Sequence, residues 1–186
     1  EAPMVYILLG DGFETAEALV TANILRRGGV ETALAGIGGA AVTSSHGITV
    51  ETDCAVERVR LTAGDMLVLP GGLGGVNSIA ACPAAMELAG QAARSEELWL
   101  GAICAAPAML AQAGLLHAGQ RAVCYPGMEV ALAEAGLVPC MDRHVVRDGQ
   151  LITGRAPGSA YEFGLALLEA LAGAGTARQV RADMYV

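Results

Sequence analysis

Short, continuous apolar runs alternate along the chain with longer segments in which apolar residues recur every three or four positions. The short runs are typical of strands buried on both faces, and the wider spacing is typical of amphipathic helices. This alternation predicts a three-layer α/β/α sandwich of the flavodoxin-like type with a largely parallel sheet. The predicted strands are Val5–Leu9, Val30–Ala35, Asp65–Pro70, Leu98–Ile103 and Arg121–Cys124. The predicted helices are Glu14–Arg27, Gly75–Ala81, Pro83–Arg94, a segment beginning at Ala105, Met128–Ala135 and Ser159–Leu171.

Polar and glycine residues also predict two tighter connections. Ala41–Thr43 and Ile48–Val50 are read as short strands or a hairpin. The Asp148-Gly149 pair lies between alternating strand residues of Val145–Thr153, which is a strong hairpin signal. The last residues, Thr176–Val186, form a short amphiphilic tail. We find no internal repeat and no linker.

The length of 186 residues and the hydrophobic content of 54% favour one globular domain over residues 1–186. The first residues lack the basic and apolar regions of a signal peptide, and no apolar stretch approaches the roughly 20 residues that span a bilayer. We therefore expect a soluble, cytoplasmic protein that does not enter membranes.

The net charge of −8 opposes binding to nucleic acid, because such binding depends on basic side chains and on counterion release. All 11 basic residues are arginines. Without a lysine amine the chain cannot form a Schiff base, attach pyridoxal phosphate or build a P-loop.

The number of cysteines, 5, is odd, and they form no C-x-x-C pair and have no histidine at zinc-ligand spacing. The simplest interpretation is reduced thiols in a reducing compartment, with no structural zinc and no disulfide framework. No metal ion and no organic cofactor is indicated.

Cys104 lies where the strand pattern Leu98–Ile103 changes into a helix pattern. A helix that begins at Ala105 would direct unpaired backbone N–H groups and the positive end of its dipole at the sulfur, which favours a thiolate. The alternative is a buried cysteine that acts as a small apolar residue at a strand end. Position alone does not decide between these interpretations.

Three segments favour a functional role for this cysteine. Ligands of parallel sheets bind beyond the carboxyl ends of the strands, and Gly10–Gly12, Gly71–Gly75 and Cys104 all follow predicted strands. We therefore expect them to meet at one edge of the sheet.

Two glutamates begin the first predicted helix on the same side. If Glu17 points inward, desolvation near a thiolate would raise its pKa, and the protonated carboxyl could then exchange a proton at the sulfur. For Glu14, a favourable interaction with the helix dipole is a sufficient explanation.

Backbone amides complete the candidate site. Gly71-Gly72 could present N–H groups to an oxyanion formed at a carbonyl that Cys104 attacks, and the N–H of Ala105 would be a second donor. A Gly-Gly pair after a strand can equally be only a tight turn. Tyr125-Pro126 follows the next strand and could place a phenol or a backbone group in the pocket.

None of the three histidines, His46, His117 and His144, lies in an obvious catalytic motif. No His-x-Glu occurs near the end of the chain, which argues against a glutamine-amidotransferase triad. A protease is the least favoured enzyme class, because no histidine flanks Cys104.

With these residues identified, the chain resembles the ThiJ/PfpI superfamily, in the branch that contains the parkinsonism-associated protein deglycase and bacterial YajL. Gly12–Glu17 resembles the family's glutamate-bearing first loop and helix, Leu69–Gly72 its oxyanion turn, and Ala102–Pro107 its nucleophile elbow. Arg155–Ser159, followed by Glu162-Phe163, resembles the Pro-Gly segment and final helix. The resemblance covers nearly the whole chain.

The resemblance implies that Cys104 is the reactive thiolate, Glu17 its protonated partner, and the amides of Gly72 and Ala105 the oxyanion site. It also implies a homodimer with an interface near the first helix. The residues expected around the pocket are Glu14, Gly71, Tyr125, Pro126, Arg155 and Pro157.

Tyr125 departs from the family pattern, because several members carry a histidine beside the cysteine at this position. A phenol is a far weaker base near neutral pH than an imidazole. Glu17 would then handle most of the proton transfer, and turnover would be modest.

Two functions from different classes follow from the resemblance. The first is a cysteine-dependent, glutathione-independent glyoxalase or deglycase acting on small carbonyl substrates, namely methylglyoxal-type 2-oxoaldehydes or early glycation adducts. The second is a non-enzymatic oxidative-stress sensor or chaperone that acts through oxidation of Cys104.

Overall fold

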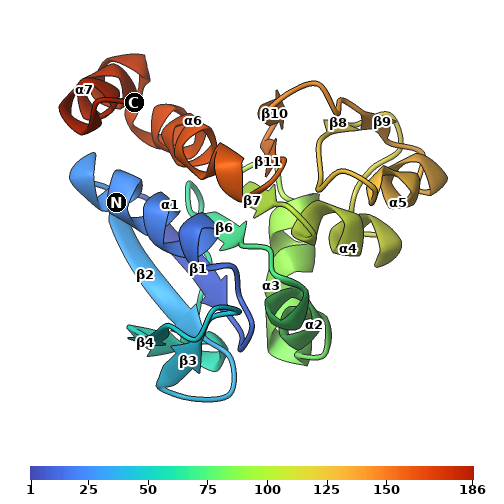
Figure 1. The fold of residues 1–186 in the computed structure, drawn as a ribbon, viewed down its shortest axis with the longest axis horizontal. Coiled ribbons are helices and arrows are strands. Elements are labelled where there is room, and N and C mark those ends of the chain that lie inside the picture. Colours follow the sequence, from blue (N-terminus) through green and yellow to red (C-terminus); the bar gives the residue numbers. More distant parts are fainter.

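A seven-stranded, mostly parallel sheet forms the centre of the molecule, with the strand order β10-β11-β7-β6-β1-β2-β5 (Figure 1). The computed structural model describes all residues from Glu1 to Val186. Only the pairing of β10 with β11, at one edge, is antiparallel. The strands of this sheet are β1 (Met4–Leu9), β2 (Glu31–Gly36), β5 (Cys54–Ala55), β6 (Met66–Leu69), β7 (Trp99–Ile103), β10 (Val145–Asp148) and β11 (Leu151–Gly154).

Helices cover both faces of the sheet and confirm the predicted three layers. Figure 1 shows α1, α6 and α7 on one side, and α2, α3 and α4 on the other. Alternate side chains of a strand enter different apolar clusters: Ile7 packs with Phe163 of α6, whereas Leu8 packs with Leu110 of α4. The helices are α1 (Thr15–Arg27), α2 (Leu73–Ala80), α3 (Pro83–Arg94), α4 (Ala106–Gln112), α5 (Glu129–Glu134), α6 (Ala160–Ala172) and α7 (Ala174–Met184), with 3₁₀ turns η1 (Val56–Arg58) and η2 (Pro157–Ser159).

The two predicted hairpins are both present. The first pairs β3 (Ala41–Thr43) with β4 (Thr49–Glu51), and the second joins β10 to β11 through Gly149. Gly149 has a φ of +60°, a conformation that suits glycine in a tight turn. Both pairs of strands therefore lie where the sequence predicted them.

Two segments near the carboxyl-terminal half differ from prediction. The predicted strand Arg121–Cys124 is only β8 (Arg121–Ala122), and it pairs with β9 (Val138–Pro139) outside the main sheet. The predicted short tail is instead the helix α7, which packs its buried Ala177 and Val180 into the same apolar cluster as α6. None of the helices has both the length and the apolar composition that crossing a membrane requires.

Candidate active site

Cys104 forms a sharp elbow between β7 and α4. Its φ of +67° lies in the left-handed region, which costs an L-residue about 1–2 kcal/mol. Two backbone hydrogen bonds hold this conformation: the Cys104 N–H donates to the Gly154 oxygen at 2.9 Å, and the Tyr125 N–H donates to the Cys104 oxygen at 2.8 Å. Strain of this kind clusters at functional sites because the surrounding structure must impose it.

Glu17, in the first turn of α1, is completely buried. Its Oε1 accepts a hydrogen bond from the Gly71 N–H at 2.8 Å, whereas its Oε2 has no hydrogen-bond partner. Burial raises the pKa of Glu17 to about 7, although hydrogen bonding with the Cys104 thiol and with the Gly71 N–H lowers it. A carboxyl with this pKa can both donate and accept a proton near neutral pH.

Gly71 lies between the carboxyl and the thiol. A Cβ at this position would lie 2.6 Å from Cys104 Cβ and 3.1 Å from its Sγ, and would also collide with Glu17 Oε1. Only a residue without a side chain fits in this space. The absence of a Cβ therefore allows Glu17 and Cys104 to approach each other.

The pKa of the Cys104 thiol is raised to about 12, first by burial and then by the Glu17 carboxylate. The N–H groups of Ala105 and Gly72 act in the opposite direction, as predicted for amides that face the sulfur. The expectation that the helix start favours a thiolate is therefore wrong for the net shift, because burial and the Glu17 carboxylate together outweigh the two N–H groups. A thiolate at Cys104 requires the proton to reside on Glu17, since two adjacent buried negative charges repel each other.

An open hollow of about 570 Å³ lies over the sulfur. The predicted residues Gly72, Ala105, Tyr125 and Pro126 line it together with Cys104 and Glu14. Glu17 and Gly71 do not line the hollow; both are buried against the cysteine. Sequence reasoning missed three lining residues: Leu73, Gly127 and Met128.

Glu14 has the structural role expected of it and a position at the pocket as well. Its side chain caps α1, because Oε2 accepts a hydrogen bond from the Glu17 N–H at 2.8 Å. Its own N–H donates to the Gly71 oxygen at 2.9 Å. Glu14 thereby joins the start of α1 to the Gly71 turn.

Gly72 is required by the conformation of this turn. Its φ is +84°, and a Cβ would lie 2.6 Å from the Glu14 nitrogen and 2.9 Å from the Phe13 carbonyl carbon. The close approach of the loop after β1 fixes the direction of the Gly72 N–H.

Arg155 and Pro157 do not line the hollow, which corrects the expectation for both residues. The Arg155 guanidinium donates to the Met141 oxygen at 3.2 Å and lies 3.4 Å from His144 Nδ1. Pro157 begins the turn η2, whose Ser159 hydroxyl lies 2.8 Å from His144 Nδ1. Both residues thus organise the connection between β11 and α6.

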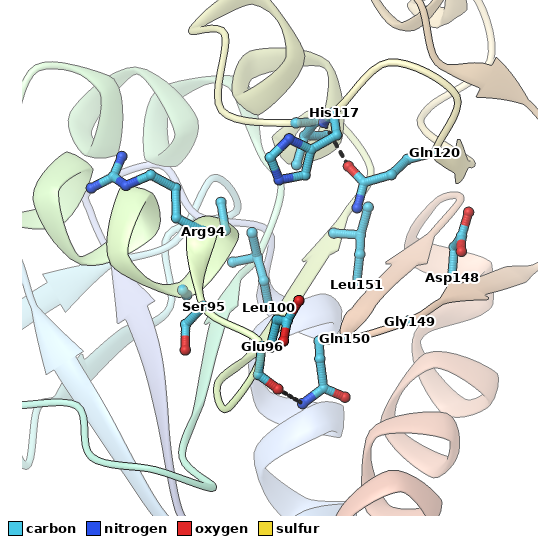
Figure 2. Close-up of a pocket in the computed structure, with 13 residues that line it drawn as sticks. Arg94, Ser95, Glu96, Leu100, His117, Gln120, Asp148, Gly149, Gln150 and Leu151 are labelled. Carbon is cyan, nitrogen blue, oxygen red and sulfur yellow. Dashed lines mark hydrogen bonds between the residues drawn. The ribbon is translucent and has the colours of Figure 1, made fainter.

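A second hollow, of about 350 Å³, lies at the opposite ends of the strands, where β7 and β11 begin (Figure 2). Its polar groups are partly paired with each other: the His117 N–H donates to Gln120 Oε1 at 2.7 Å, and Gln150 Nε2 donates to the Glu96 oxygen at 3.3 Å. It contains no thiol. The hollow over Cys104 is therefore the candidate active site.

No three His, Cys, Asp or Glu side chains converge in an arrangement that could hold a metal ion. The polar groups at the pocket are the Cys104 thiol, the buried Glu17 carboxyl, the amides of Gly72 and Ala105, and the side chains of Glu14 and Tyr125.

Comparisons with known proteins show the family and the fold of the chain. Residues 3–170 match the profile of the DJ-1/PfpI family. Protein dj-1beta of Drosophila melanogaster is 38% identical over 184 residues, covering 97% of this chain and 95% of that protein. The crystal structure of Drosophila melanogaster DJ-1beta aligns with a TM-score of 0.90 at 33% identity, covering 100% of this chain and 99% of that chain.

Two further relatives have names that describe an activity. A Caenorhabditis elegans protein named a glutathione-independent glyoxalase is 33% identical over 160 residues, covering 86% of this chain and 83% of that protein. A Pyrococcus abyssi protein named a deglycase is 36% identical over 159 residues, covering 86% of this chain and 93% of that protein.

Proposed function

Because the chain belongs to the DJ-1/PfpI family, we propose that it is a cysteine-dependent, glutathione-independent glyoxalase or deglycase. Its substrates would be methylglyoxal-type 2-oxoaldehydes or early glycation adducts. The observation that carries the proposal is the pairing of Cys104 with Glu17 across Gly71, beneath an open pocket.

The reaction begins with the Cys104 thiolate adding to the aldehyde carbon, which forms a C–S bond. The carbonyl oxygen becomes an oxyanion, which the N–H groups of Gly72 and Ala105 stabilise, and it takes the proton from Glu17 to give a hemithioacetal. The raised pKa of Glu17 supports this role, because burial stabilises the protonated form that donates.

The Glu17 carboxylate then removes the proton from the former aldehyde carbon and returns it to the neighbouring carbon, while the hydroxyl proton of the hemithioacetal passes to the former ketone oxygen. The aldehyde carbon is thereby oxidised to a thioester while the ketone is reduced to an alcohol, so no external redox partner is needed. Water cleaves the thioester, which releases a 2-hydroxy acid and restores the thiol. For methylglyoxal the product is lactate.

The deciding experiment measures lactate formed from methylglyoxal by the fully reduced protein without glutathione. We expect turnover in the unaltered protein and none in Cys104→Ser or Glu17→Gln. Circular dichroism of each variant checks that the fold is retained. Activity retained in either folded variant would refute the mechanism.

A second candidate function is an oxidative-stress sensor or chaperone. It is favoured by the buried Glu17 carboxyl, which interacts with the Cys104 thiol and whose Oε2 has no other hydrogen-bond partner, because a protonated carboxyl could donate to a sulfinate at Cys104. The corresponding test is mild peroxide treatment followed by mass spectrometry and a holdase assay. A gain of two oxygens confined to Cys104, with holdase activity changing in step, supports a sensor; oxidation spread evenly over Cys54, Cys82, Cys124 and Cys140 argues against it.

A further inference from the structure

The pocket over Cys104 is much larger than a three-carbon substrate needs. Its volume of about 570 Å³ lies within the range of roughly 300–1,000 Å³ that is typical of sites for drug-sized ligands. Methylglyoxal bound at the sulfur would leave most of this space to water. The pocket can therefore accept a substituent that extends away from the reacting carbonyl.

The walls of this space are mainly apolar. Leu73, Tyr125, Pro126 and Met128 line it together with Cys104. The Leu73 side chain is 67% exposed and Tyr125 is 46% exposed, so both present apolar surface to the opening. Apolar side chains gathered around a reactive group are typical of a site that binds an apolar ligand.

The charged groups near the pocket are all acidic. Glu14 lines it, Glu129 accepts a hydrogen bond from the Gly127 N–H at 2.6 Å, and the Cys104–Glu17 pair carries one negative charge in the thiolate form. No arginine or histidine lines the pocket, and the whole chain carries a net charge of −8. An anionic substrate would be repelled both at a distance and within the pocket.

We propose that this pocket selects uncharged 2-oxoaldehydes with an apolar substituent larger than methyl, such as aryl glyoxals, and discriminates against anionic ones. The proposal rests on the proposed function and narrows its substrate class. The residues that set this preference are Leu73 and Met128 on the wall, with Glu14 at the edge.

The first test compares three substrates of graded chemistry: methylglyoxal, phenylglyoxal and 4-carboxyphenylglyoxal. We expect kcat/KM for phenylglyoxal to exceed that for methylglyoxal by about tenfold or more, because burying the ring removes apolar surface from water. The carboxylated compound has nearly the same shape, yet it should fall at least about tenfold below phenylglyoxal. Equal values for all three substrates would overturn the proposal.

Variants identify the residues responsible. Leu73→Arg places a cation at the opening, and it should raise the ratio of 4-carboxyphenylglyoxal to phenylglyoxal turnover by about tenfold. Val130→Arg is the matched control, because Val130 is a similarly exposed apolar residue, at 60%, outside the pocket lining. A ratio that moves equally in both variants would contradict a role for the pocket wall.

Alkylation of Cys104 separates a failure of this proposal from a failure of the proposed function. The rates for 2-bromoacetophenone, iodoacetamide and iodoacetate are measured by mass spectrometry of the Cys104 peptide and divided by those of a free model thiol. Normalised rates that decrease from 2-bromoacetophenone to iodoacetamide to iodoacetate support the apolar, anion-excluding pocket, even if no 2-oxoaldehyde is turned over. Normalised rates that are equal, or highest for iodoacetate, refute it even if methylglyoxal is a substrate.

Discussion

Two buried cysteines, Cys104 and Cys124, lie close together in this fold but in different surroundings. Both thiol pKa values are raised mainly by burial, to about 12 for Cys104 and about 11 for Cys124. Cys124 lies within an apolar cluster, and its thiol is 3.5 Å from the Tyr125 carbonyl oxygen. Cys104 instead faces a buried carboxyl and two backbone N–H groups.

The difference shows that burial alone does not make a thiol a nucleophile. Cys124 keeps its proton, because its thiol donates to a carbonyl oxygen, the Glu129 carboxylate disfavours a second negative charge, and no backbone N–H stabilises a thiolate there. At Cys104 the neighbouring carboxyl can take the proton, and the amides of Gly72 and Ala105 can stabilise the resulting charge. The polar neighbours of Cys104 therefore distinguish the candidate nucleophile from a residue of the core.

Replacing each of the two cysteines with alanine should give the largest difference in activity between two variants. Cys104→Ala should lower lactate formation by at least about 10³-fold, because the nucleophile is lost. Cys124→Ala should keep activity but lower the free energy of unfolding by about 1–2 kcal/mol, because it leaves a small cavity at a completely buried position. Steady-state assays and urea denaturation measure the two effects, and similar activities for both variants would remove the contrast.

The buried carboxyl should make stability depend on pH. The pKa of Glu17 rises from 4.5 to about 7 on folding, so the folded state retains a proton that the unfolded state releases between these values. The stabilisation is complete below pH 4.5 and is lost as pH rises through 7, up to about 3 kcal/mol in total.

Glu17→Gln should remove this decrease, whereas Cys124→Ala should keep it. Urea denaturation at pH 5 and pH 8 provides the measurement. The same loss of stability in Glu17→Gln and in the unaltered protein would assign the effect to another group.

Adding a methyl group between Glu17 and Cys104 should lower the activity. Gly71→Ala introduces a Cβ that collides with Glu17 and Cys104, and we expect activity to fall by about tenfold to a hundredfold. Gly158→Ala is the control, because no atom lies within 4 Å of the added Cβ. Equal activities of the two alanine variants, each confirmed as folded, would show that Glu17 and Cys104 need not be this close.

The smallest effect is expected at Tyr125. Its backbone N–H, not its phenol, donates to the Cys104 oxygen, and the residue is exposed to solvent. Tyr125→Phe should therefore change kcat and KM for methylglyoxal by no more than about twofold. A loss of tenfold or more would assign proton transfer to the phenol instead of to Glu17.

The order of strands and helices, and the position of Cys104, could be predicted because both depend on local patterns. The Leu98–Ile103 run identified β7, and the change to helical spacing located the elbow at its end. The separate pairing of β8 with β9 could not be predicted, since two-residue strands give almost no periodic signal.

The pKa shifts at the site were harder to predict from the sequence than the location of the site. The pKa of Cys104 is raised first by burial and then by the Glu17 carboxylate, and both depend on the packing of segments distant in sequence around Gly71. Leu73 and Met128 were missed because each lies at or just before the first residue of a helix. An apolar residue at such a position does not by itself indicate a pocket. The homodimer and the cytoplasmic location remain predictions.

The hydrogen bond between Glu17 and Gly71 joins residues 54 positions apart. The remaining parts of the site, at Cys104 and Tyr125, belong to still later segments. Contacts between such distant segments form late when a chain folds, because each requires the closure of a long loop. Cys104 is also held by the Gly154 oxygen of β11. Recovery of the proposed activity during refolding would therefore report the joint assembly of the segments from Glu14 to Gly154, and not the formation of any single element.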